Sequence, residues 1–257
     1  MAENPASMPA GYRLVELDDV DSTNAEAGRL LDAGECGPLW VRANAQLAGR
    51  GRKGRHWVSR PGNLYATLLM MPDAPVACMA QLGFVACLAI YDMAARLLGS
   101  DAGLTLKWPN DVLLDGRKLS GILTESLLIK GSQRYAAALG CGVNLAHAPG
   151  DTRYGATCLA DHGRSATPAE ALHHLAHAFE HWRSVWSDGA GFDQVRQAWT
   201  DRSVPLGAAM VLDLAEECVE GRFAGLARDG ALMLDLADGT QKQIRAGDVL
   251  HAHPTAG

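Results

Sequence analysis

The segment Leu104–Asn144, LTLKWPNDVLLDGRKLSGILTESLLIKGSQRYAAALGCGVN, decides the fold class of this chain. Its apolar residues come in short runs, and the pairs Asp115-Gly116 and Lys130-Gly131 are typical of tight hairpin turns. The pattern predicts four successive strands, at Leu104–Lys107, Asp111–Leu114, Leu119–Ile129 and Tyr135–Asn144. Strands grouped in this way around single helices indicate an α+β domain. A doubly wound parallel sheet would alternate helices and strands instead.

Single helices and further strands are predicted on both sides of that segment. Thr23–Leu31 is predicted to be a short helix, because Thr23 and Glu26 have the spacing of a capping box and Gly34 follows as a stop signal. Longer helices are predicted at Met79–Leu98, Pro168–Trp186 and Phe192–Asp201, strands at Tyr12–Leu17, Leu39–Ala45 and Asn63–Met71, and a loose tail at residues 1–11.

The chain changes character after Pro205. Short alternating strands, separated by Gly or Asp-Gly, run to His251 and predict a small β-barrel of about 50 residues. The predicted strands are Ala209–Ala215, Gly221–Ala227, Ala231–Leu236, Gln241–Arg245 and Val249–His251. We therefore predict two domains, residues 1–203 and 204–257.

The composition excludes several classes of protein. Of the 257 residues 48% are hydrophobic, which is typical of a globular chain, and the net charge of −6 argues against a general nucleic-acid binder. The longest apolar run, Leu82–Ile90, is about half of a membrane span, and the N-terminus has no signal-peptide pattern.

The six cysteines match no zinc or disulfide spacing and indicate a reduced, cytoplasmic protein. His173, His177 and His181 share a helix face, but no Cys or carboxylate motif completes a metal site.

Two segments have the residue types of an anion-binding site. Gly49–Arg55, GRGRKGR, alternates glycines with cations and is followed by Trp57. Glycine lets a backbone approach a ligand closely, and the arginine fork suits phosphate or carboxylate. The alternative is a solvated basic loop or an RNA-binding stretch. Lys107–Asp111, KWPND, contains good turn chemistry in Pro-Asn-Asp, so an ordinary turn and a ligand site are both compatible with it.

Three further segments carry polar or glycine residues at strand and helix ends. Lys118 begins an apolar strand, where it either points inward and needs an anionic partner or stays in solvent at the hairpin mouth. Gly140–Asn144, GCGVN, offers a flat patch for a ring system or for a crossing helix. Asp21–Asn24 begins the first helix, where amides and hydroxyls also bind polar ligands. Of only five lysines, three lie in these segments (Lys53, Lys107 and Lys118), which argues against independent surface lysines.

In combination and in order, these segments resemble the biotin protein ligase family. The resemblance rests on Ser22–Asn24, Gln46, Gly49–Arg55, Trp57, Lys107–Asp111, Lys118–Leu123 and Gly140–Asn144, and Pro205–His251 resembles the SH3-like C-terminal domain of the family. It implies an α+β fold with a mixed sheet and packed helices, like class II synthetases and biotin and lipoate ligases, followed by an SH3-like β-barrel. Some members carry an N-terminal winged-helix domain. About eleven residues precede the catalytic domain here, which implies the ligase-only form that does not bind DNA.

The resemblance also implies a two-step reaction. Biotin and ATP, with Mg²⁺, form biotinyl-5′-AMP and pyrophosphate. A lysine of a biotin carboxyl carrier protein, from acetyl-CoA carboxylase or a related carboxylase, then takes the biotinyl group. The enzyme is expected to be a monomer or homodimer with no membrane partner, and Mg²⁺ is expected to arrive with ATP and not in a side-chain cluster.

The implied site residues follow the family motifs. Catalytic roles fall to Lys118, Asp111 and Arg52. The implied biotin contacts are Ser22, Thr23, Asn24, Gln46, Arg50, Gly51, Arg52, Lys118, Gly121 and Gly142, and the implied ATP or adenylate contacts are Arg52, Arg55, Trp57, Asn110, Lys118 and Asn144. In this site Gly121 and Gly142 leave room for the rings of biotin and Trp57 stacks near the adenine. The arginine loop closes over the ligands.

Two alternatives remain open. A lipoate or octanoate ligase or transferase shares the fold and the acyl-transfer chemistry, although the KWPND segment and the arginine loop favour biotin. A non-enzymatic ligand- or nucleic-acid-binding regulator would use the basic loop. It would leave Lys118 and the KWPND turn unexplained, and it fits poorly with a pI of about 5.8.

Overall fold

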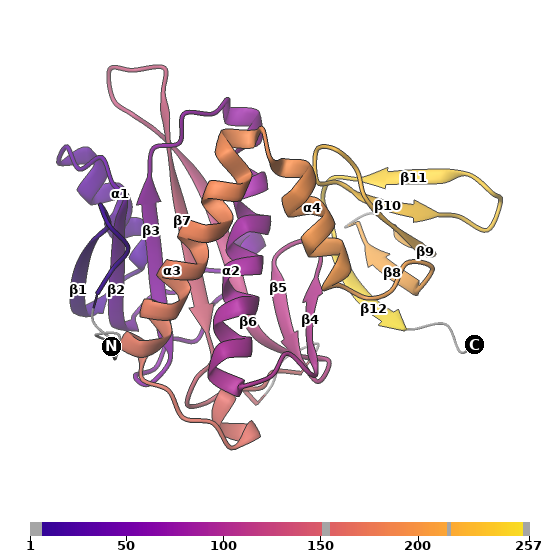
Figure 1. The fold of residues 1–257 in the computed structure, drawn as a ribbon, viewed down its shortest axis with the longest axis horizontal. Coiled ribbons are helices and arrows are strands. Elements are labelled where there is room, and N and C mark those ends of the chain that lie inside the picture. The colour runs from indigo at the N-terminus through magenta and orange to yellow at the C-terminus, as the bar shows by residue number, and fades with distance from the viewer. Residues whose placement is uncertain (1–6, 151–154, 215–216, 254–257) are drawn as a thin grey trace.

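Seven strands form the central sheet of the larger domain, in the order β1-β2-β3-β7-β6-β5-β4 (Figure 1). The computed structural model describes residues 7–150, 155–214 and 217–253. The strands are β1 (Arg13–Val20), β2 (Leu39–Gln46), β3 (Leu64–Met70), β4 (Leu104–Lys107), β5 (Asp111–Leu114), β6 (Arg117–Leu128) and β7 (Tyr135–Val143). β1 and β2 are parallel, and the other neighbouring pairs are antiparallel, as the hairpin turns predicted. The sheet is therefore mixed, and the predicted α+β class is confirmed.

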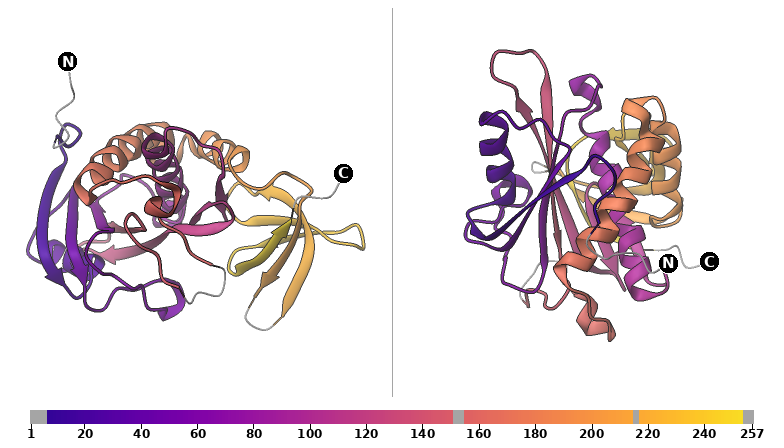
Figure 2. Two further views of the ribbon diagram at one scale, coloured as in Figure 1. Left: turned by 90° about the horizontal axis from the view of Figure 1, so that it is seen from below. Right: turned by 60° about the vertical axis from the view of Figure 1, so that its left-hand side comes forward.

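Helices cover the two faces of the sheet unequally (Figure 2). α2 (Gln81–Leu98) and α3 (Pro168–Trp186) pack side by side on one face, with α4 (Phe192–Asp201) against both. α1 (Thr23–Asp32) packs on the other face, against β2, β3 and β7. The segment Val76–Leu98 is apolar and long enough to cross a membrane by composition, but most of it is buried between the sheet and α3.

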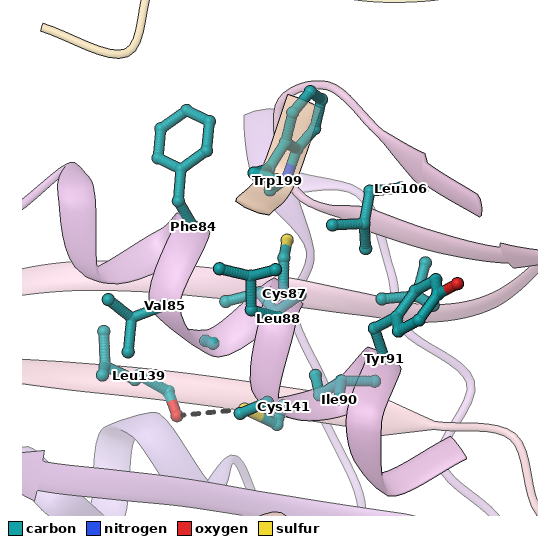
Figure 3. Close-up of a cluster of buried hydrophobic side chains, with 14 of the residues drawn as sticks. Phe84, Val85, Cys87, Leu88, Ile90, Tyr91, Leu106, Leu139, Cys141 and Trp199 are labelled. Atoms are coloured by element: carbon teal, nitrogen blue, oxygen red, sulfur yellow. Dashed lines mark hydrogen bonds between the residues drawn. The ribbon is translucent and has the colours of Figure 1, made fainter. Parts of the chain in front are cut away.

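Alternate residues of β7 face the two layers. Leu139 and Cys141 lie in the main core with Val85, Leu88 and other side chains of α2 (Figure 3). The intervening Gly140 and Gly142 approach α1 and the loop after β2 on the opposite face. This two-residue period gives β7 one packed face and one flat face. The flat face borders the cavity described below.

The smaller domain is one antiparallel sheet, in the order β11-β10-β9-β8-β12. Its strands are β8 (Ala209–Asp213), β9 (Cys218–Leu226), β10 (Leu232–Asp235), β11 (Gln241–Ile244) and β12 (Asp248–His253). Phe223 and Leu232 belong to the same hydrophobic core as α2 and α4, and the Trp108 indole donates to Gly230 O at 3.2 Å. The β-barrel predicted after Pro205 is confirmed as a small antiparallel β domain, although no pairing of β11 with β12 closes its described strands into a barrel. This domain packs directly on the larger one.

Two local predictions were wrong, and both errors have the same cause. Ser22, not Thr23, is the N-cap of α1, and no side-chain bond caps the helix. The Thr23 hydroxyl contacts Gln46 and Thr67, and the Thr23 amide donates to Gln46 at the end of β2. The expected tail is ordered over residues 7–11, since Met8 packs on the core and His173 and His177 contact the carbonyl oxygen of Ser7. In both places, contacts with residues far away in the sequence determine the structure, and contacts with sequence neighbours do not. Residues 1–6 of the predicted tail, and Ala215 of the predicted strand, lie outside the described residues.

Candidate active site

A cavity of about 650 Å³ lies where the flat face of the sheet meets the smaller domain. Its walls come from the start of α1, the loop after β2, the β4–β5 turn, β6, β7 and strands β8 and β12. Every site residue predicted from the sequence lines it, namely Ser22, Thr23, Asn24, Gln46, Arg50, Gly51, Arg52, Arg55, Trp57, Asn110, Asp111, Lys118, Gly121, Gly142 and Asn144. Segments far apart in the chain therefore converge on one cavity, which favours a ligand site over an ordinary turn and a solvated loop.

The loop between β2 and β3 is folded into a small hairpin. The Gly51 amide donates to Arg55 O at 2.7 Å, and the Trp57 amide donates to Gly49 O at 2.9 Å. At the tip, Lys53 has φ 56°, a conformation that few non-glycine residues adopt. Gly49 allows the close approach, because a Cβ there would stand 2.5 Å from Trp57 O. The backbone thus presents the loop's cations on a defined turn.

Asp248 of β12 is the anion that three of these cations contact, whereas Arg50 lies 3.5 Å from Glu125 of β6. Lys53 Nζ lies 3.2 Å from Asp248 Oδ2, Arg52 lies 3.5 Å from Oδ1, and Arg55 also pairs with Oδ2. Burial raises the pKa of Asp248, but Lys53 and Arg55 outweigh it and hold that pKa below its usual range. The smaller domain therefore holds the loop through one largely buried carboxylate. No acidic residue close in sequence does so.

The β5–β6 hairpin brings a second charge pair into the cavity. Lys118 Nζ lies 2.6 Å from Asp111 Oδ1, and both side chains are largely buried. The strand register shifts between Val112 and Leu113, and a bulge of this kind redirects the side chains beside it. Lys118 thus has the anionic partner that an inward lysine needs, and the solvent alternative is wrong. Burial also lowers the pKa of the neighbouring Lys107, an effect that the charge of Asp111 opposes.

Two asparagines tie these segments together. Asn110 Oδ1 accepts from Arg52 at 3.3 Å, and Asn110 Nδ2 donates to Ile122 O, so the β4–β5 turn is bound to both the basic loop and β6. Asn144 Nδ2 donates to Thr157 O at 3.1 Å and to Lys118 O at 3.4 Å. The amide hydrogens of Asn144 are therefore used inside the protein, where they hold the segment around Thr157 against β6.

The flat glycine patch carries the Trp57 indole. A Cβ on Gly142 would stand 2.6 Å from the indole, and one on Gly121 would stand 3.2 Å from it. The Lys118 ammonium lies 5.4 Å from the centre of the same ring, within cation–π range. The patch that the family resemblance assigned to the rings of biotin is thus covered here by an aromatic side chain from the basic loop.

Polar side chains bind the loop to the start of α1. Gln46 Oε1 accepts from the Thr23 amide at 2.9 Å, and Gln46 Nε2 donates to Ser59 Oγ at 2.9 Å. Ser59 in turn donates to Trp57 O at 2.9 Å. Gln46 therefore accepts from the Thr23 amide, which the predicted capping box would have paired with the Glu26 side chain.

Sequence reasoning missed four residues at or beside the cavity: Asp213 and Asp248 of the smaller domain, and Thr67 and Glu125 of the central sheet. Only Glu125 gave a local signal, as the one acidic residue of β6. The other three come together only through the fold.

Comparison with known proteins places the chain in a family. Residues 20–144 match the model of the Biotin/lipoate A/B protein ligase family, and residues 211–251 match the Biotin protein ligase C terminal domain. A Biotin--[acetyl-CoA-carboxylase] ligase of Paracoccus denitrificans is 43% identical over 224 residues, which cover 85% of this chain and 92% of the relative.

Solved structures share the fold of both domains. The biotin protein ligase from Aquifex aeolicus in complex with biotin and ATP superposes with a TM-score of 0.77 at 27% identity, covering 92% of this chain and 97% of that one. The biotin protein ligase from Leishmania major in complex with biotinyl-5-AMP gives a TM-score of 0.62 at 26% identity, covering 93% and 100%. With both domains matched and the predicted site residues gathered on one cavity, the chain belongs to the biotin protein ligase family.

Proposed function

We propose that this chain joins biotin to ATP as biotinyl-5′-AMP and then transfers the biotinyl group to a lysine of a biotin carboxyl carrier protein. The observation that carries the proposal is the set of cations on one cavity, from the loop after β2 and from Lys107 and Lys118. The name of the Paracoccus relative indicates the carrier of acetyl-CoA carboxylase as the acceptor. We place the activity in the cytoplasm, where the six unpaired cysteines stay reduced.

The first step requires neutralisation of charge. The biotin carboxylate attacks the α-phosphate of ATP, a bond forms between a carboxylate oxygen and phosphorus, and pyrophosphate leaves. Lys118 offsets the charge of both anions, and its pairing with Asp111 at 2.6 Å holds the ammonium in place before the ligands arrive. Arg52 and Arg55 exchange their contact with Asp248 for the phosphates, so the hairpin closes over the adenylate.

Mg²⁺ enters this scheme with ATP. The oxygens of Asn110 and Asp111 line the cavity wall and are of the type that Mg²⁺ binds, beside phosphate oxygens and water. When bound, the ion neutralises charge on the departing pyrophosphate.

The second step uses the same acidic residue. The carrier lysine attacks the biotinyl carbonyl carbon, a C–N bond forms, and AMP leaves with the electrons of the C–O bond. Asp111 orients the incoming amine and receives a proton from it. A hairpin that excludes water until the carrier docks protects the mixed anhydride from hydrolysis.

Exchange of labelled pyrophosphate into ATP tests the proposal. We expect exchange with biotin, none with lipoate or octanoate, and a mass gain of one biotinyl group on an added carrier domain. Exchange with lipoate and not with biotin would assign the chain to the lipoate ligases instead, and exchange with neither would remove the enzymatic assignment.

A further inference from the structure

Asn63 carries a buried amide that has no part in the mechanism above. It lies one residue before β3 and is 1% exposed. Its Oδ1 accepts from three successive backbone amides that follow β7, namely Leu145 and Ala146 at 2.9 Å and His147 at 3.3 Å. In the part of the chain that the structure describes, these three amides have no other acceptor. One side-chain oxygen therefore holds the backbone that leaves β7.

The contacts of the amide nitrogen fix the orientation of Asn63. Its Nδ2 donates to His147 O at 2.9 Å, since a carbonyl oxygen can only accept. The same Nδ2 lies 3.3 Å from His147 Nδ1, while His147 Nε2 lies 3.0 Å from Pro61 O. Because Pro61 O takes the Nε2 hydrogen, the neutral ring turns the lone pair of Nδ1 towards Asn63. Every polar atom of the two side chains thus has a partner, which is the condition under which a buried polar group holds a single geometry.

The glycine before Asn63 lets the two segments approach each other. Gly62 has φ 106°, a conformation that L side chains rarely adopt. A Cβ on Gly62 would also stand 3.2 Å from the Cβ of Ala146, so that the neighbouring backbone would have to move. The stretch Pro61–Asn63 is therefore built to hold residues 145–147.

The segment 144–149 forms a cavity wall that lies away from α1. Gly140 of β7 lies against Asn24 of α1, and Asn144 comes four residues later, which is about 13 Å along a strand. Asn144 and Pro149, on either side of the three held amides, both line the cavity. The biotin contacts implied by the family resemblance begin at the start of α1. The wall at segment 144–149 is therefore left for the nucleotide.

We propose that Asn63 is a positioning residue for ATP, which holds the segment 144–149 in place at the nucleotide end of the cavity. The inference rests on the proposed function. Asn63 does not line the cavity, so it acts through this segment and not by contact with a ligand. Without the Asn63 oxygen, three neighbouring amides must turn to water or to other acceptors, and the wall moves with them. The biotin contacts near α1 do not depend on these amides.

Asn63→Leu tests the proposal, because leucine has nearly the shape of asparagine but neither accepts nor donates a hydrogen bond. Exchange of pyrophosphate into ATP gives the KM for ATP and the KM for biotin in one assay. We expect the KM for ATP to rise about tenfold and the KM for biotin to change by less than about twofold. Amide hydrogen exchange at residues 145–147 should be faster than in the wild type.

Two further variants separate positioning from a general loss of stability. Gln81→Leu removes another amide oxygen, which accepts from the Trp186 indole at 2.7 Å and lies outside the cavity lining. It should lower the stability to urea and leave both KM values unchanged. Asn63→Asp keeps an oxygen for the three amides and loses the donor to His147 O. Its KM for ATP should lie between those of the wild type and Asn63→Leu, and it takes the same test if Asn63→Leu does not fold.

Equal rises in the two KM values, or an unchanged KM for ATP, would overturn the proposal and leave Asn63 with a role in stability alone. Either result leaves the ligase assignment intact, provided that the wild type exchanges pyrophosphate into ATP with biotin. A wild type without that exchange would overturn the proposed function itself.

Discussion

At the scale of single residues, the cavity is built from charges that already have partners. Lys118 and Asp111 lie 2.6 Å apart in a largely buried place, where a lone charge would be costly. The pair keeps the ammonium desolvated yet compensated. When two ligand anions arrive, the lysine needs little reorganisation to bridge them, and such prior placement is a large part of electrostatic catalysis.

Lys118→Ala should therefore block adenylation and not merely carrier transfer. We expect biotinyl-5′-AMP formation to fall about a hundredfold, a loss on the order of 3 kcal/mol in transition-state stabilisation. Single-turnover chemical quench with labelled ATP measures this step alone. Lys130→Ala at the β6–β7 turn is the matched control, because that side chain is 78% exposed and lies outside the cavity lining. A near wild-type rate of adenylate formation would remove Lys118 from the first step.

At this scale the sequence pointed to site residues whose amino-acid type is rare in the chain. Few lysines made Lys107 and Lys118 conspicuous, and both line the cavity. Thr23 was misread as a cap, because hydroxyls at a helix start serve caps and ligands alike, and the competing acceptor Gln46 comes from another element. Thr67 gave no signal, since a threonine in a largely apolar, fully buried strand resembles any strand residue.

At the scale of elements, the hairpins were predictable and the basic loop only in part. Asp-Gly and Lys-Gly turns carry local conformational signals, so the β4–β7 strands appear within a few residues of their predicted bounds. The loop's glycines indicated freedom of movement. Its cations, however, contact Asp248, and Arg52 also donates to Gly247 O at 3.4 Å. The loop is therefore a hairpin held by contacts with the smaller domain, and we propose that it serves as a lid whose arginines exchange Asp248 for phosphate.

Arg52→Ala should loosen this lid. The variant loses a cation that contacts both Asn110 and the smaller domain, and it loses the charge-assisted contact that we propose with phosphate. We expect adenylate to form still but to dissociate about tenfold faster. Stopped-flow release of biotinyl-5′-AMP measures the rate, and Arg60→Ala, at an exposed position just beyond the loop, is the control. An unchanged release rate would contradict the lid.

At the scale of the whole molecule, the smaller domain completes the cavity. Asp248 and Lys53 are 195 positions apart, and no periodicity or turn signal connects residues at such a separation. The change in strand pattern after Pro205 predicted a separate small domain. No feature of the sequence indicated that β12 brings a carboxylate to the basic loop. That contact depends on how Trp108 and the shared core hold the two sheets together. Removal of the smaller domain would therefore also disturb the lid.

The contacts between the basic loop and the smaller domain should be sensitive to acid, because they depend on the charge of Asp248. Because folding lowers the pKa of this carboxyl, its contacts stabilise the folded chain above the pKa of an unfolded Asp, about 3.9, and lose that effect as the pH falls through the lower folded-state pKa. Urea unfolding of the wild type and of Asp248→Asn should thus differ by a constant amount from neutral pH down to about pH 5, with the wild type more stable. Below about pH 4 the difference should shrink as the wild-type carboxylate takes up its proton.

Asp73→Asn, at a side chain that is 96% exposed, should show little difference at any pH. If the gap between wild type and Asp248→Asn stayed constant down to about pH 3, the ionised carboxylate would not be what holds the basic loop to the smaller domain.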